Sequence, residues 1–169
     1  PGTVNWYTVS SGGSTIGTGY TFNPVGVASS GLSNTNTAGT FTYFAECSTN
    51  PGCRTAANYV IKPSTAITAQ PQSVAICPST STVLSVTASG ENLSYQWKSS
   101  GSNVGTNQNS YTASSGGKFN VTVTGTCGSV NSDTATVTIN KSTNVLVDPV
   151  SDSICSGKNT TLTVSAEGV

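Results

Sequence analysis

Hydrophobic residues along this chain alternate with polar ones in short runs, and clusters of Ser, Gly, Asn and Pro separate the runs. The clearest run is GKFNVTVTG at 117–125, where Phe119, Val121 and Val123 would face one side. Alternation with a period of two is typical of strands that bury one face. No stretch of the sequence keeps a helical period for three turns. The pattern therefore predicts an all-β protein with many turns.

Residues 65–142 hold a full set of such runs and are expected to form one complete domain. Its third run, LSYQWKS, alternates Leu93, Tyr95 and Trp97. About seven short strands, a turn roughly every ten residues and a Trp on the third strand predict an immunoglobulin-like β-sandwich. Trp97 and Phe119 are expected in its core. Strands are expected at 66–76, 82–89, 93–99, 109–113, 117–125 and 133–140.

The segments 71–90 and 149–168 repeat one another without gaps at an offset of 78 residues (149 − 71). The same offset pairs Phe41 with Phe119, so both are expected in cores. Residues 1–64 are then the C-terminal part of one sandwich, from its third strand onward. Residues 143–169 are the first two strands of a further sandwich. Matched pairs include Pro71/Pro149, Ile76/Ile154, Cys77/Cys155, Leu84/Leu162 and Val86/Val164.

The two partial domains are expected to complete each other between copies. If Pro1 followed Val169, VSAEGV and PGTVNWYTV would align with VTASGENLSYQWKSS, and Trp6 would take the core position of Trp97. That joined domain has an insertion near 23–37. Two arrangements fit: covalent tandem repeats in a very long chain, or separate subunits that exchange strands. In both, copies of the chain are partners along one axis.

Composition argues against several functions. Only 7% of residues are charged and the net charge is zero, which argues against nucleic acid, whose phosphates need clustered Lys and Arg. The chain has no His, so triads that use it are impossible. The six acidic residues are scattered, and the cysteines lack zinc-site spacing. We expect no enzyme activity, no metal and no cofactor.

Five cysteines in a Ser- and Thr-rich β protein indicate an oxidising compartment, and so a secreted or cell-surface location. Cys77 and Cys127 bracket Trp97 and are expected to pair. Their bridge would close a loop of about 50 residues, worth on the order of 4 kcal/mol. Three aromatic residues lie out of phase with the inward set and could form a binding patch or ordinary sheet surface: Tyr7, Tyr20 and Phe44.

The stretches ICPSTSTVLSVTASG, YQW and GGKFNVTVTGTCG, with AGTFTYFAECSTNPGCRTA, resemble immunoglobulin-like domains of the Bacteroidetes. Such domains repeat in very large secreted or surface proteins, including adhesin-like proteins exported by the type IX system. Similar domains often carry a second Cys at the position of Val169. The resemblance therefore implies that Cys155 pairs with Cys53 across copies, or else that Cys47 pairs with Cys53. It also implies O-glycosylation at two Asp-Ser/Thr-apolar sites, Ser153 and Thr134.

The function expected from these features is structural: an extracellular stalk or filament of head-to-tail, disulfide-stabilised sandwiches. The alternative is an adhesin that binds glycan or another cell through the 23–37 insertion and exposed aromatic residues. A spacer within a secreted polysaccharide-degrading enzyme is a third possibility.

Overall fold

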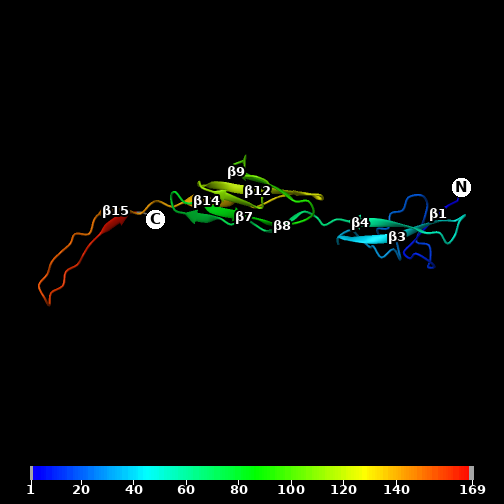
Figure 1. Cartoon of the computed structure of the whole chain (residues 1–169), viewed down its shortest axis with the longest axis horizontal. Helices are drawn as coiled ribbons and strands as arrows, with labels where there is room; N and C mark the ends of the chain where they lie inside the picture. The colour runs from blue at the N-terminus through cyan, green and yellow to red at the C-terminus, as the bar shows by residue number, and fades with distance from the viewer. Residues whose placement is uncertain (1, 168–169) are drawn as a thin grey trace. The chain divides into compact units, whose positions relative to one another are not determined.

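The computed structural model describes residues 2–167, so the expected junction between Val169 and Pro1 lies outside the described residues. Every regular element in that range is a β-strand (Figure 1), which confirms the all-β prediction. Residues 2–167 contain no helix able to cross a membrane. The chain divides into two compact units, and the main division falls between Thr65 and Ala66.

The second unit is a two-layer sandwich. Its first layer has the spatial order β10 (Ser102–Val104), β9 (Ser94–Ser99), β12 (Gly117–Gly125), β14 (Ala135–Ile139), β6 (Val74–Ile76), with β13 (Gly128–Asn131) beside β12. Its second layer pairs β7 (Thr82–Ser85) with β11 (Ser110–Ala113), and β5 (Ala66–Ala69) with β8 (Thr87–Ser89). This division of successive strands between two layers is that of an immunoglobulin-like sandwich.

The core of the second unit lies between the two layers. Alternate residues of β12 point inward, and Phe119 and Val121 are fully buried there. Trp97 on β9 is 0% exposed, and its indole Nε1 donates to the carbonyl oxygen of Gln108 at 3.0 Å. Leu84 and Val86 close the core from the second layer.

The first unit contains one four-stranded antiparallel sheet within residues 2–65. Its order is β2 (Gly17–Thr18), β1 (Val4–Tyr7), β3 (Gly39–Cys47), β4 (Thr55–Ile61). In place of a second layer, residues 20–33 pack against this sheet without forming a strand. Phe22 stacks on Trp6 with ring centroids 5.3 Å apart, and Leu32 is buried.

The strands repeat at the same offset as the sequence. β3 and β12 differ by 78 at both ends (117 − 39 and 125 − 47). Two further strands, β15 (Asn144–Val147) and β16 (Ser165–Glu167), repeat β5 and β8 in the same way (144 − 66 and 165 − 87). β15 pairs with β16 just as β5 pairs with β8. The repeat is therefore present in the strand bounds and pairing as well as in the residues.

One expected equivalence is wrong. Trp6 lies opposite Ala45, whose counterpart Val123 lies opposite Tyr95. Trp6 thus occupies the ladder position of Tyr95, two residues from that of Trp97. An alignment across the chain ends cannot fix register, because a strand can slip by two residues and keep the same face inward. Trp6 still faces inward, half-buried, and its Nε1 donates to the carbonyl oxygen of Gly19 at 2.9 Å.

Candidate functional site

The inward face of the first unit's sheet is the best candidate for an interaction site. Cross-strand neighbours share a face, so Phe41 lies beside Tyr59, and Tyr43 beside Ala57. Trp6 on β1 joins the same face through its partner Ala45. The result is a neutral, mostly aromatic surface built by β1, β3 and β4.

This face is covered far less than its counterpart in the second unit. Ala57 on β4 is exposed, whereas its counterpart Ala135 on β14 is 0% exposed. Tyr59 is half-buried, whereas its counterpart Val137 is buried. The reason is the missing second layer, since β7 and β11 have no strand counterparts among residues 2–65.

The segment from Phe22 to Leu32 covers only part of the face, and polar bonds hold it there. The hydroxyl of Ser30 donates to the carbonyl oxygen of Pro24 at 2.7 Å. The hydroxyl of Tyr43 donates to the carbonyl oxygen of Ser30 at 3.1 Å. Burial raises the pKa of Tyr43, which keeps this phenol protonated as a donor.

Beside this segment the face forms a small hollow of about 100 Å³. It is lined by Trp6, Phe22, Pro24, Tyr43, Ala57, Asn58 and Tyr59. Small-molecule sites usually occupy about 300–1,000 Å³, so this hollow is undersized for one. An extended segment that lies across the face fits its open, apolar character better.

The predicted aromatic patch lies elsewhere and is largely closed. Tyr7 is buried beneath the guanidinium of Arg54, whose Cζ lies 3.3 Å from the ring centroid. Phe44, its neighbour on β3, is half-buried. Tyr20 is 74% exposed, and its hydroxyl donates to the carbonyl oxygen of Gly2 at 3.0 Å. The expectation that Tyr7 is exposed is wrong, because the long cationic side chain of Arg54 covers it.

Arg54 belongs to an ion pair that sequence reasoning missed. Its Nε donates to the carboxylate of Glu46 at 2.9 Å, and its Nη1 donates to the carbonyl oxygens of Val9 and Gly12. The hydrogen bond from Arg54 lowers the pKa of Glu46, and one from the Gly52 amide lowers it further. Two opposite charges flanking the CSTNPGC turn were the available signal. The pair braces the β3–β4 hairpin.

The structure contradicts the expected bridge between Cys77 and Cys127, and it leaves both thiols unpaired and exposed. Cys77 follows Ile76, which lies opposite Ile139, beyond the Gly117 end of β12. Cys127 follows the other end of β12. Eight residue steps along that strand span about 26 Å, whereas bridged Cα atoms lie within about 7 Å. The sequence showed that the cysteines bracket Trp97, but it did not show that they lie at opposite ends.

The same argument applies to the pairing of Cys155 with Cys53. Cys155 is the counterpart of Cys77, and Cys53 precedes the start of β4. A joined domain built like the second unit would hold them at opposite ends, which disfavours this pairing; it stays a prediction. The pairing of Cys47 with Cys53 fits better, because Ala45 faces Thr55 and the register continued by two residues sets these cysteines opposite each other. It stays a prediction.

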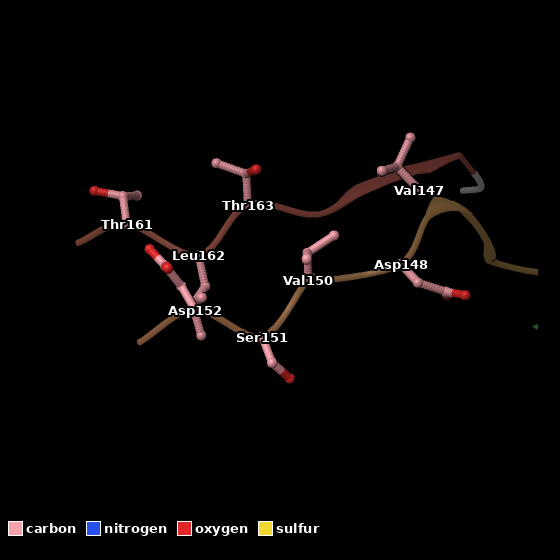
Figure 2. Close-up of a pocket in the computed structure, with 8 residues that line it drawn as sticks. All are labelled: Val147, Asp148, Val150, Ser151, Asp152, Thr161, Leu162 and Thr163. Carbon is pink, nitrogen blue, oxygen red and sulfur yellow. The ribbon is translucent and has the colours of Figure 1, made fainter. Parts of the chain in front are cut away.

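A second apolar surface lies in the C-terminal segment. Residues 141–167 are exposed throughout, including Val150, Ile154, Leu162 and Val164. In Figure 2, Leu162 points toward the leg that carries Asp152, whereas Thr161 and Thr163 point away from it. The segment thus has an apolar side and a Thr-rich side. This is the pattern of a β-strand that buries one face, but here the apolar side is not covered.

The remaining sites stay predictions. Ser153 and Thr134, the expected glycosylation sites, are both exposed. Within residues 2–167, no group of three potential metal ligands comes together.

Solved structures that are similar to this chain include three built of Ig-type domains. They are a chimeric titin Z1Z2-Z1Z2 tandem (16% identity, 60% of this chain and 64% of that chain, TM-score 0.41), titin domain M7 (20%, 47% and 96%, 0.40) and the tandem Ig repeats of Dlar (13%, 60% and 63%, 0.41). The chain spans less than two thirds of the two tandem structures. No family model and no curated protein matches it. TM-scores this low support no functional argument, so the sandwich assignment rests on the strand pairing.

Proposed function

We propose that this chain is a non-catalytic structural module of an extracellular stalk or filament, in which immunoglobulin-like sandwiches follow one another along one axis. The observation that carries the proposal is the repeat of strands at an offset of 78 residues, seen in β3 and β12 and again in β5 and β15. A chain that repeats one sandwich gains length without needing a new fold for each step. The Ser- and Thr-rich composition and the Cys47–Cys53 pairing that the β3–β4 register allows support the extracellular location.

The second unit is suited to tension. β6 lies near the start of the domain, β14 ends it, and the two strands run parallel. Tension on the chain would pull β6 and β14 in opposite directions along their length. All hydrogen bonds of that ladder would then be sheared together instead of being opened one by one.

Single-molecule stretching of the purified chain tests this role. One rupture should release a contour length of roughly 250–270 Å, less the length of the folded domain, because residues 66–140 extend at about 3.3–3.6 Å each. The Asn140 amide donates to the carbonyl oxygen of Ile76, so Val74 is the next residue whose amide faces β14. Val74→Pro should lower the rupture force. Asn103→Pro, on β10 at the other edge of the layer, is the matched control.

Equal rupture forces in both variants, or a second unit that extends without a distinct rupture, would contradict the mechanical role. The second candidate function is a binding module, favoured by the exposure of Tyr20. Binding of the whole chain to a glycan array, lost in Tyr20→Ala, would favour it.

A further inference from the structure

We propose that residues 152–164 of a second copy of this chain close the inward face of the first unit, with residues 152–154 added parallel to β4. The inference deepens the proposed stalk, because it names the contact that joins one copy to the next. We call the inward face of the first unit's sheet the acceptor face and residues 152–164 the donor segment. Four observations carry the inference. The acceptor face is open, the donor segment is exposed, two expected strands are absent from the donor segment, and the second unit contains counterparts of the face and the segment packed together.

The covered counterpart is the second unit. There, β6 pairs with β14, while Leu84 and Val86 lie over the core from the second layer. At an offset of 78 residues, β6 corresponds to 152–154 and β7 to 160–163. The end of β14 corresponds to the end of β4 (139 − 61). The chain therefore contains its own example of this segment seated on this sheet.

The donor segment has the side chains for the contact but lacks the contact. Leu162 is 63% exposed, whereas its counterpart Leu84 is 2% exposed. Ile154 and Val164 are likewise exposed, and their counterparts Ile76 and Val86 are buried. The position next to Leu162 also agrees with this arrangement. Its counterpart Val83 points outward and is exposed, and here it is the polar residue Thr161.

Within residues 143–167, strands form only where the partner strand lies in the same segment. β5 and β8 pair with each other, and their counterparts β15 and β16 form and pair. β6 and β7 pair with β14 and β11, and their counterparts 152–154 and 160–163 form no strand. The segment thus forms the ladder it can make internally. Residues 152–154 lack the pairing that β6 makes with β14, and β4 is the counterpart of β14 in the first unit.

The acceptor is free to take it. β4 is the last strand in its sheet, so one edge carries unpaired backbone groups among the described residues. Copying the register of the second unit sets Tyr59 beside Asp152, Val60 beside Ser153, and Ile61 beside Ile154. Leu162 and Val164 then lie over the exposed Ala57 and its neighbours. Asp152 takes the inward position of Val74, which packs against the core of the second unit, so one carboxylate lies at the edge of the face beside Tyr59.

This register also places Ser153 on the outer side, because its counterpart Ala75 is exposed. A sugar on Ser153 would be compatible with docking.

The test uses the full chain in sedimentation velocity over a range of concentrations. Wild type should form a concentration-dependent series of oligomers. Leu162→Asp should weaken association at least about 100-fold, because it would bury an unpaired charge. Thr161→Asp, the adjacent position on the other side, should leave it unchanged. On the acceptor, Ala57→Asp should abolish the series, and Ala56→Asp on the outer face should not.

The decisive experiment mixes the Leu162→Asp chain with the Ala57→Asp chain. A Leu162→Asp chain keeps its acceptor, and an Ala57→Asp chain keeps its donor. The mixture should form one-to-one dimers and nothing larger. Three results would overturn the proposal: a wild type that stays monomeric throughout, oligomers that tolerate both inward aspartates, and a monomer whose residues 152–164 are protected within one chain. Oligomers that tolerate both aspartates would leave the stalk function standing, since stretching tests it separately.

Discussion

The two units of this chain show what a second layer does for the same sheet. β3 and β12 share their bounds at the 78-residue offset, and both turn a phenylalanine inward at the same position. In the second unit that residue, Phe119, is buried, whereas Phe41 in the first is half-buried. The difference lies in what covers the strand, not in the strand itself. The burial of an inward side chain in this fold therefore depends on the second layer that covers its strand, which the strand's own sequence does not encode.

The largest expected contrast comes from a charge placed at one position in both units. Ala135→Asp should unfold the second unit, at a cost of about 4 kcal/mol or more, because it buries an unpaired carboxylate. Ala57→Asp, its counterpart, should cost under about 1 kcal/mol in the dilute chain, since Ala57 is exposed. Hydrogen exchange of peptides from each unit measures both. Equal costs would show that the first unit is already covered.

The inward phenylalanines give the next contrast. Phe119→Ala should cost about 3–5 kcal/mol, as large-to-small changes in a packed core do. Phe41→Ala should cost about half as much or less in the dilute chain, because it is only half-buried there. Urea unfolding of each unit, followed by hydrogen exchange, gives the two free energies. If assembly covers the inward face of the first unit, the difference between the costs of Phe119→Ala and Phe41→Ala should shrink as the protein concentration rises.

Acid should affect the first unit selectively. The Arg54 hydrogen bond lowers the pKa of Glu46 below its usual value, so the carboxylate favours folding at neutral pH. That stability is fully present above the usual pKa of about 4.3 and is lost as pH falls through the lowered folded value. Acid unfolding of wild type should therefore start in the first unit below about pH 4.3. Glu46→Gln should remove this pH dependence, and an unchanged profile would contradict the role of the pair.

The smallest expected effect concerns the cysteines. Cys77→Ser should change the stability of the second unit by under about 0.5 kcal/mol, because the thiol is exposed and lies far from Cys127. A bridge would have been worth on the order of 4 kcal/mol. Alkylation without reductant, read by mass spectrometry, should label both thiols in the monomer. Resistance of the pair to alkylation within one chain would restore the original prediction.

Alternation predicted the strands well, because a period of two is local information. β12 and the inward set of Phe119, Val121 and Val123 follow directly from it. Register and distance were harder. The positions of Trp6 and of Cys77 relative to Cys127 depend on how strands slide past one another, which spacing along the chain does not encode.

The candidate site was predictable only in part. The repeat predicted that residues 1–64 and 143–169 of different copies complete one domain, which stays a proposal, and two features of the first unit escaped notice. Residues 20–33 cover the sheet without any alternating pattern, so Phe22 and Leu32 gave no strand signal. The closure of Tyr7 depends on Arg54, which is distant in sequence and reaches it through a long side chain.

The most direct test of strand exchange between copies is hydrogen exchange of the wild-type chain at low and high concentration. The account predicts that amides in 152–154 and 160–164 become protected as concentration rises. Those of β15 and β16, already paired with each other, should change little. Amides of β4 should gain protection over the same concentration range. Unchanged exchange at 152–164 in a chain that nevertheless assembles would contradict the account.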